Sequence, residues 1–182
     1  MAYQKVQAGL ALGAPARFWD LPIDLVSQMA GTNVNGVMYA THAVLNHGMW
    51  ERGRGTIINI SSVTGLECPP FPGEAVYHAS KAFLEGFTNS LRMETDGSNI
   101  RVTSLRPGCV RTHFHLQRVQ YDQKAMDEFF EGYEPLVAGD LADAVLYILS
   151  TPERISIKAL DCVPTAQRAL TRFDRDWNSR NA

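Results

Sequence analysis

Apolar residues along the chain follow two alternating spacings, which predict strands separated by helices. Short runs rich in branched and apolar residues at 57–60, 100–105 and 155–163 have the length of buried strands. Apolar residues recur every three or four positions at 83–91 and at 141–149, as they do along the buried face of a helix. Strands that alternate with helices form a parallel sheet, so the pattern predicts an α/β fold with right-handed crossovers.

A longer helix is predicted ahead of the first of these strands. It covers most of residues 22–53, where Pro22 and Asp24 favour a helix start and Gly53 favours its end. The middle of this segment, Gly31-Thr32-Asn33, is poor helix material. We therefore expect the helix to be weakened at that point.

The two ends of the chain carry weaker patterns. Residues 1–9 contain several polar side chains and are poor material for a strand buried on both faces. Residues 116–134 are polar with a few apolar positions at near-helical spacing, which predicts one short helix, and Asp140 is expected to cap the helix that follows. Residues 166–182 are amphipathic at best, and their aromatic residues would dock either on this domain or on a neighbouring subunit.

Length, charge and cysteine content indicate an ordinary cytosolic globular protein. With 182 residues the chain is expected to form one domain. The net charge of −2 and the absence of a Lys/Arg cluster argue against nucleic-acid and membrane-surface binding, and no apolar run is long enough to cross a bilayer. Cys68, Cys109 and Cys162 are widely spaced and odd in number, which predicts reduced thiols and a cytoplasmic location.

The candidate chemistry lies around Tyr77 and Lys81. Residues four apart on a helix share one face, so these two side chains should lie side by side. A free phenol has a pKa near ~10, and an adjacent ammonium lowers it. Ser62, at the carboxyl end of the strand at 57–60, could hydrogen-bond the same substrate oxygen. The three groups would move a proton on or off that oxygen, although an exposed Tyr–Lys helix pair is the alternative interpretation.

The order of these motifs gives the pair its significance. A strand, Ser-Ser-x-x-Gly, Tyr-x-x-x-Lys and a second strand ending in Arg-Pro-Gly follow one another along the chain. From about Ala8 onward, the chain resembles the short-chain dehydrogenase/reductase family of nicotinamide-dependent oxidoreductases with a Rossmann-like fold. The tail LDCVPT resembles the NADP-dependent 3-hydroxy acid (serine, allo-threonine) dehydrogenase branch. The motifs that carry the resemblance are Asn33-x-x-Gly36, INISSVTG, YHASK and RPGCVRT.

The resemblance implies a role for each residue of the catalytic set. Tyr77 would be the general acid/base, and Lys81 would lower its pKa and hold the nicotinamide ribose. Ser62 would polarise the substrate oxygen. Asn33 would complete a proton relay through water, unless it is an asparagine merely tolerated at the weakened helix.

The resemblance also implies how a nicotinamide cofactor is held. Besides Tyr77 and Lys81, the family grips the nicotinamide carboxamide with groups that correspond to Val110 and Thr112. NADP is the expected cofactor, and NAD stays open. Family members begin with a Gly-rich turn and helix N-terminus that bind the cofactor pyrophosphate, and no such turn precedes residue 9 here.

We therefore expect residues 1–182 to form a single incomplete domain, the C-terminal part of a truncated, doubly wound parallel sheet of three or four strands with flanking helices. Such a chain should bind dinucleotide poorly by itself. A non-catalytic homologue that pairs with a full-length reductase is one alternative, and the product of a truncated gene is another. The expected partners are a small carbonyl or alcohol substrate and a second subunit, bound through the helices that carry Asn33 and Tyr77.

Two further segments were weighed for binding roles. The loop at 68–73, rich in proline, would form one wall of the substrate pocket or be a neutral surface insertion. His113 and His115 have no obvious third ligand nearby in sequence, so we expect a variable substrate loop there and no metal site.

Overall fold

The computed structural model describes residues 3–6, 9–69 and 72–182 of the chain. Its centre is a sheet of four strands in the order β1-β2-β3-β4, in which every neighbouring pair is parallel. This confirms the predicted α/β fold. The strands are β1 (Tyr3–Val6), β2 (Arg54–Ile60), β3 (Asn99–Pro107) and β4 (Ala159–Cys162).

The opening segment forms a strand, contrary to the weak pattern of its sequence. β1 pairs with β2 in register from Tyr3 opposite Thr56 to Val6 opposite Asn59. In the described sheet it occupies an edge, where a strand pairs on one side. Backbone hydrogen bonding to β2 therefore accounts for this strand, although its sequence lacks the apolar pattern of a buried strand.

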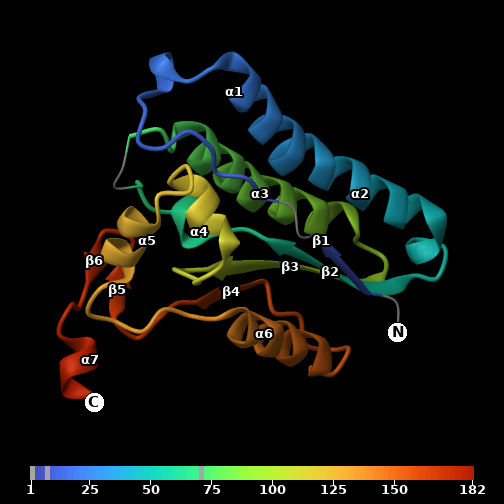
Figure 1. The fold of residues 1–182 in the computed structure, drawn as a ribbon. Helices are drawn as coiled ribbons and strands as arrows, with labels where there is room; N and C mark the ends of the chain where they lie inside the picture. Colours follow the sequence, from blue (N-terminus) through green and yellow to red (C-terminus); the bar gives the residue numbers. More distant parts are fainter. Residues whose placement is uncertain (1–2, 7–8, 70–71) are drawn as a thin grey trace.

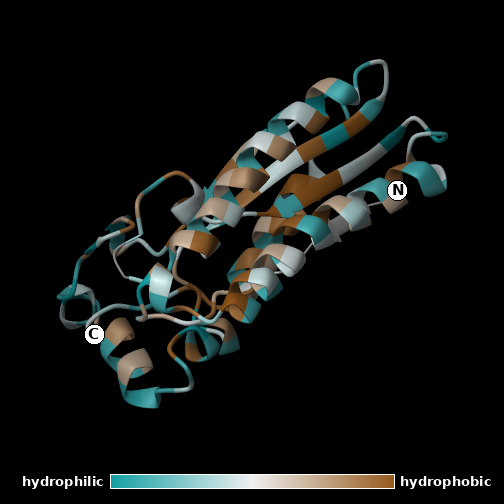
Figure 2. Cartoon of the chain, turned by 90° about the horizontal axis from the view of Figure 1, so that it is seen from above, coloured by the Kyte–Doolittle hydropathy of each residue, from teal (hydrophilic) through white to brown (hydrophobic). Residues whose placement is uncertain are grey.

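Helices cover both faces of the sheet (Figure 1). Along β2 and β3 successive side chains point to opposite faces. Ile57 and Val102 pack toward α2 and α3, whereas Ile58 and Leu105 pack against α6. Figure 2 shows apolar, brown segments in the strands between helices whose colours alternate. The helices concerned are α1 (Ile23–Ala30), α2 (Gly36–Val44), α3 (Ala75–Glu94) and α6 (Ala138–Ser150).

The long predicted helix is present and is distorted where expected. α1 and α2 run into each other through η2, a π-helical turn over Gly31–Asn35. A π turn inserts one extra residue and rotates the following helix face. Asn33 in this turn is completely buried. A second π-helical segment, η3 (Leu45–Met49), ends the long helix at Gly48, whose φ is +110°.

The segment after β3 differs from its prediction. Two helices, α4 (His113–Arg118) and α5 (Gln123–Phe130), replace the single helix expected over 116–134. Gln120 and Tyr121 between them have positive φ values of 55° and 67°, which breaks the helical path. Asp140 caps α6 as predicted. It does so from the third position of the helix, where its carboxylate accepts a hydrogen bond from the N–H of the N-cap residue Val137 at 2.8 Å.

The chain ends in a short hairpin and a helical turn that pack on α5. They are β5 (Gln167–Ala169), β6 (Arg172–Phe173) and α7 (Trp177–Arg180). Phe173 and Trp177 pack against a buried cluster that includes Phe130 and Tyr133. These aromatic residues thus dock on their own domain, which is one of the two alternatives predicted for them. Two 3-10 turns, η1 (Phe18–Asp20) and η4 (Val63–Gly65), complete the elements described.

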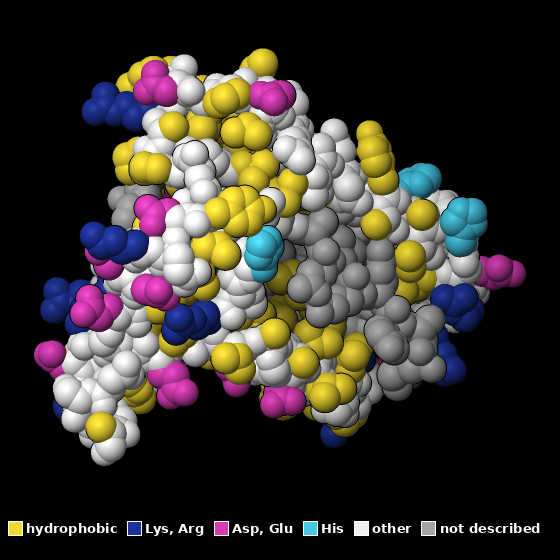
Figure 3. Space-filling model, in the orientation of Figure 1, with side chains coloured by type: hydrophobic (Ala, Val, Ile, Leu, Met, Phe, Trp, Pro, Cys, Tyr) yellow, Lys and Arg dark blue, Asp and Glu magenta, His cyan; other side chains and the backbone are white. Residues whose placement is uncertain are grey.

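The surface charges are mixed. On the face drawn in Figure 3, Lys and Arg side chains are interspersed with Asp and Glu side chains around the C-terminal elements on the left. Among the described helices, none combines the length and apolar character that a membrane span requires.

Candidate active site

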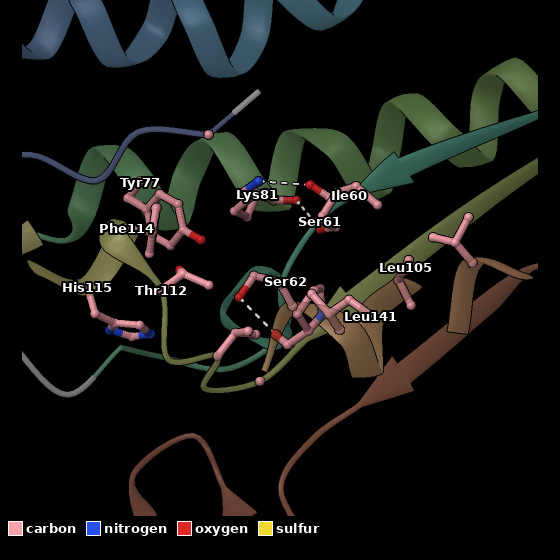
Figure 4. Close-up of a pocket in the computed structure, with 16 residues that line it drawn as sticks. Ile60, Ser61, Ser62, Tyr77, Lys81, Leu105, Thr112, Phe114, His115 and Leu141 are labelled. Carbon is pink, nitrogen blue, oxygen red and sulfur yellow. Dashed lines mark hydrogen bonds between the residues drawn. The ribbon is translucent and has the colours of Figure 1, made fainter. Parts of the chain in front are cut away.

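The carboxyl ends of β2 and β3 and the first turns of α3 enclose a pocket of about 440 Å³. Ligands of parallel α/β sheets bind at this edge, because the loops that follow the strands diverge there. Figure 4 shows the Tyr77 phenol pointing from α3 toward the turn of Ser62, and the Lys81 amine beside the end of β2, where a dashed line joins it to Ile60. The structure brings five of the six predicted site residues together in this lining: Ser62, Tyr77, Lys81, Val110 and Thr112.

Lys81 is buried between α3 and the end of β2. Its Nζ donates a hydrogen bond to the Ile60 carbonyl at 2.8 Å and lies 5.6 Å from the centre of the Tyr77 ring. The Ser61 hydroxyl donates to the Lys81 carbonyl at 3.3 Å, so strand and helix are joined twice at this point. Burial lowers the pKa of the Lys81 amine to about 8, since the charged form loses hydration.

Tyr77 departs from the expectation that a neighbouring ammonium lowers its pKa. Burial raises the pKa of this phenol to about 12, against the opposing effects of a hydrogen bond with Ser62 and the positive charge of Arg118. Loss of hydration of the phenolate is therefore the larger effect here. At neutral pH the phenol is protonated and can donate a proton to a substrate oxygen.

Ser62 is held by the turn that follows β2. Its hydroxyl oxygen accepts a hydrogen bond from the Thr64 N–H at 3.2 Å as the cap of η4, and its O–H lies 3.4 Å from the Pro107 carbonyl. The glycine of the Ser-x-x-Gly motif allows this turn to lie against α3. A Cβ on Gly65 would come within 2.9 Å of the Lys81 carbonyl oxygen. The motif thus brings the Ser62 hydroxyl toward the face of α3 that carries Tyr77 and Lys81.

Asn33 lies behind the pocket. Its side chain donates to the Leu10 carbonyl at 2.8 Å and to the Ser80 hydroxyl at 3.0 Å, and accepts from the Leu10 N–H at 2.8 Å. These bonds tie the segment after β1 to α3. The amide side chain therefore positions the walls of the site, and its predicted part in a proton relay stays a prediction.

Val110 and Thr112 follow β3 and line the pocket opposite α3. The backbone around them is fixed because the Arg111 N–H donates to the Leu136 carbonyl at 2.8 Å. Gly108, from the Arg-Pro-Gly motif, permits close packing at this turn, since a Cβ there would meet Gln167 Oε1 at 2.3 Å. The hydroxyl and amine donors facing this pocket suit the hydroxyl and amide groups of a nicotinamide riboside.

A second, smaller cavity of about 60 Å³ adjoins the first. The two share Ser62 and Tyr77, but the smaller one continues to Glu74 and Arg118, which form a buried ion pair with side chains 6% and 12% exposed. Sequence reasoning missed this pair. No local spacing connects the two residues, because Glu74 precedes α3 and Arg118 ends α4.

The structure places the two histidines and the proline-rich loop, which the sequence suggested as parts of the substrate site, in different positions. Burial and the charge of Arg118 lower the pKa of His115 to about 3, so the ring is neutral in the pocket wall, while His113 is exposed. Of the proline-rich loop, Pro70 and Phe71 lie outside the described residues. Glu74, just after that loop, lines the smaller cavity.

Known proteins resemble this chain over most of its length. The family model for short chain dehydrogenase matches residues 6–123. Sulfoacetaldehyde reductase 2 from Chromohalobacter salexigens is 40% identical over 172 residues, which cover 93% of this chain and 66% of that protein. Serine 3-dehydrogenase from Rhizobium radiobacter is 38% identical over 161 residues, covering 88% of this chain and 62% of the relative. The chain thus spans less than two thirds of the length of these relatives.

Solved structures agree with the fold. The closed form of serine dehydrogenase complexed with NADP+ superimposes with a TM-score of 0.84 at 34% identity, over 91% of this chain and 65% of that one. The relatives also include an NADP-dependent 3-hydroxy acid dehydrogenase from Schizosaccharomyces pombe, 36% identical over 88% of this chain. Because the matched residues include β2, α3 and β3 together with most of the side chains that line the larger pocket, the chain belongs to the short chain dehydrogenase family.

Proposed function

We propose that the protein transfers a hydride between NADP and the carbonyl–alcohol pair of a small molecule, with Tyr77 as general acid/base. The observation that carries the proposal is the meeting of the Tyr77 phenol and the Ser62 hydroxyl in one pocket wall, with the buried Lys81 amine beside the phenol. Groups that can protonate and hydrogen-bond one oxygen are what a carbonyl reduction requires.

In the direction of reduction, the neutral Tyr77 phenol donates its proton to the substrate oxygen while Ser62 donates a hydrogen bond to the same atom. The positive charge of Lys81 stabilises the phenolate that this leaves behind. In the direction of oxidation, Tyr77 accepts the alcohol proton. Its raised pKa keeps the phenol protonated at neutral pH, which is the form that donates the proton in the reductive direction.

The residues facing the larger pocket fit the nicotinamide end of the cofactor. Lys81 and Tyr77 would hold the ribose, and the segment of Val110 and Thr112 would hold the carboxamide. When bound, the nicotinamide supplies or accepts the hydride. NADP rather than NAD is supported by relatives named as NADP-dependent and by the neighbour complexed with NADP+.

The cellular location, the second subunit and the type of substrate are also part of the proposal. The chain spans less than two thirds of the length of its curated relatives, so the activity of the whole-length protein is part of the proposal. We place that protein in the cytoplasm and expect a second subunit on the helices that carry Asn33 and Tyr77. The names of the relatives, serine 3-dehydrogenase and sulfoacetaldehyde reductase, support short polar substrates.

Nicotinamide fluorescence titration followed by an absorbance assay tests the function. We expect this chain to bind NADPH weakly, though more tightly than NADH, and to reduce short aldehydes slowly. Tyr77→Phe should lower turnover by about 100-fold or more, while the loss of its one hydrogen bond to the ribose should weaken NADPH binding by about 10-fold or less. Tyr121→Phe, a change of the same kind at an exposed tyrosine, should keep full activity. Full turnover by Tyr77→Phe would contradict the proposal, and NADPH binding that requires a full-length relative would favour the non-catalytic alternative.

A further inference from the structure

An acidic residue continues the line of functional side chains along α3. Glu85 lies four residues after Lys81 and eight after Tyr77, so the three side chains project from one face of the helix. The Glu85 side chain is 12% exposed and lies outside the pocket lining. Residues four apart are separated by about 6 Å along a helix axis, so Glu85 meets the sheet one turn away from the amine.

The Glu85 carboxylate accepts hydrogen bonds from β3 on both of its oxygens. Ser104 Oγ donates to Oε1 at 2.7 Å, and Arg106 donates to Oε2 from Nε at 3.1 Å and from Nη2 at 2.9 Å. Ser104 and Arg106 are two residues apart on the strand, so both point to the face that α3 covers. Burial raises the pKa of the Glu85 carboxyl, but hydrogen bonds from Arg106, Ser61 and Ser104 outweigh this effect and hold the pKa below its usual value.

These bonds connect the helix with the carboxyl ends of three strands. Arg106 Nη1 donates to Asp161 Oδ1 at 3.1 Å, and Asp161 is its direct partner in the register of β3 and β4. At the end of β2, the Ser61 N–H donates to the Leu105 carbonyl at 2.8 Å, and the Ser61 hydroxyl donates to the Lys81 carbonyl at 3.3 Å. One turn of α3 is therefore joined, directly or through Arg106, to β2, β3 and β4.

The ends of β2 and β3 lead into the turns that face the phenol. Ser62 directly follows Ser61, and Pro107 directly follows Arg106. The Ser62 hydroxyl lies 3.4 Å from the Pro107 carbonyl, so the two turns are in contact with each other. Because α3 supplies the phenol and the strand ends supply the hydroxyl, a movement of the helix away from the strands would separate these two groups.

We propose that Glu85 and Arg106 are positioning residues, which hold α3 on the ends of β2 and β3 so that the Tyr77 phenol and the Ser62 hydroxyl meet at one substrate oxygen. Both lie outside the pocket lining, so they act through the groups that they place. A misplacement of about 1 Å can cost on the order of 100-fold in rate, so a contact one helical turn away matters for catalysis. This inference rests on the proposed function, because that function requires the phenol and the hydroxyl to act together.

Arg92 provides a matched control at the far end of the same helix. Its Nε and Nη2 donate to the Val102 carbonyl at 3.2 and 3.0 Å, and Nη2 also donates to the Lys158 carbonyl at 3.0 Å. This arginine thus also joins α3 to β3, but it lies seven residues beyond Glu85, about 10 Å further along the helix axis. Loss of its contacts should weaken the packing of α3 without moving Tyr77.

Steady-state reduction of a short aldehyde by NADPH compares the variants, with urea denaturation as the measure of stability. Glu85→Met removes the hydrogen bonds at similar side-chain size, and should lower kcat by about 10- to 100-fold while changing the KM for the aldehyde by less than about 3-fold. Glu85→Gln keeps an acceptor oxygen and should stay within about 5-fold of the wild-type kcat. Arg92→Met should keep the wild-type kcat, even where its urea midpoint falls as far as that of Glu85→Met. An equal loss of kcat in Glu85→Met and Arg92→Met, or no loss in Glu85→Met, would overturn the proposal.

Arg106→Met keeps the inference testable where Glu85→Met does not fold. In this variant the Glu85 carboxylate keeps the Ser104 hydroxyl as a donor and its partial contact with water. The variant should therefore fold and show the same selective loss of kcat, by about 10-fold or more. A folded Arg106→Met protein with the wild-type kcat would contradict the positioning role.

A second measurement does not depend on turnover. The chain has four lysines, so protein labelled with 13C-lysine gives few Cε signals in NMR spectra, and Lys81→Met assigns the buried one. The Lys81 amine should titrate with a pKa of about 8 in the wild type and move toward its ordinary 10.5 in Glu85→Met, since water reaches the amine when α3 separates from β2. Loss of the Glu85 charge alone would lower the pKa of the amine, so an unchanged or lowered titration midpoint would overturn the proposal.

The two measurements distinguish this inference from the proposed function. A wild-type protein without turnover, in which the Lys81 titration responds to Glu85→Met, would contradict the oxidoreductase and support the positioning of α3. Wild-type turnover that Glu85→Met retains, with an unchanged Lys81 titration, would support the oxidoreductase and overturn the positioning role.

Discussion

Lys81 Nζ donates a hydrogen bond of 2.8 Å to the carbonyl of Ile60, the last residue of β2. The amine that lies beside the Tyr77 ring is therefore held by the end of a strand. This bond orders the helix face that carries the phenol relative to the turn that carries Ser62. It also keeps a titratable amine away from water, which affects stability as well as chemistry.

Lys81→Met is expected to stabilise the fold at pH 7 while abolishing catalysis. The pKa of this amine is about 8 in the folded protein against 10.5 ordinarily, so the unfolded chain binds the proton more tightly and the charged amine disfavours folding by about 3 kcal/mol at pH 7. Loss of the hydrogen bond to Ile60 offsets about 1–2 kcal/mol of the gain. Urea denaturation should show a net gain of about 1–2 kcal/mol.

The pH dependence of the stability gain in Lys81→Met tests the role of burial more directly than its size at pH 7. As pH rises from about 8 toward 10.5, the folded wild-type protein has already lost the proton and the unfolded chain loses it next, so the difference between the two states disappears. The stability gain of Lys81→Met should fade over that range. Lys124→Met, at an 85% exposed side chain, is the control, and an equal gain in both variants would contradict the assignment to burial.

Asn33→Ala should destabilise the protein by about 1–3 kcal/mol, because it leaves the half-buried Leu10 N–H and carbonyl without the amide that now bonds them. Asn35→Ala is the matched control. It lies in the same π-helical turn but is exposed, and should change stability by less than about 0.5 kcal/mol. Equal free energies of unfolding for the two variants would show that the Leu10 contacts contribute nothing.

Local spacing is what made the catalytic set predictable from sequence. Tyr77 and Lys81 are four residues apart on one helix, and Ser62 directly follows a strand whose apolar run is plain in the sequence. These relationships need no knowledge of distant segments. The same holds for the helix around Gly31, where a glycine near polar residues predicted a weakened helix, although not that the distortion would be a π turn.

Long-range relationships were not predictable in this way. The Glu74–Arg118 pair depends on how α4 folds back beside α3, and the turn at Gln120 and Tyr121 carries no glycine to signal its positive φ values. The raised pKa of Tyr77 was missed for a related reason. The sequence shows that Lys81 is adjacent, whereas the burial that raises the pKa of the phenol follows from the whole packed pocket.

Gly65→Ala should lower both stability and activity. An added Cβ would lie 2.9 Å from the Lys81 carbonyl oxygen and 3.0 Å from its carbon, and backbone atoms of a helix cannot move aside cheaply. The η4 turn would shift away from α3 and take Ser62 with it. We expect a loss of about 1–3 kcal/mol by urea denaturation and a lower kcat with little change in NADPH affinity.

Gly86→Ala provides the matched comparison for this change. Gly86 lies within α3, and an added Cβ there meets no atom within 4 Å. Alanine favours a helix over glycine by about 1 kcal/mol, so this variant should be more stable than the wild type. Two glycine-to-alanine changes of opposite sign would establish that the close approach of Gly65 to Lys81 is the cause.

His115→Phe should make the protein less sensitive to acid. The pKa of the buried ring is about 3 against 6.5 ordinarily, so between these values the unfolded chain binds a proton that the folded state excludes, and wild-type stability falls as pH drops below 6.5. At pH 5 this amounts to about 2 kcal/mol. Phenylalanine cannot be protonated, and it keeps an aromatic ring against Phe129, which stacks on His115 at a centroid distance of 5.4 Å, and Phe130, which meets it edge-on at 5.2 Å. Urea denaturation of both proteins at pH 7 and pH 5 isolates the effect, because any change in packing is common to the two pH values. An equal loss of stability on acidification in both proteins would show that the ring gains its proton without unfolding and that Arg118 does not repel it.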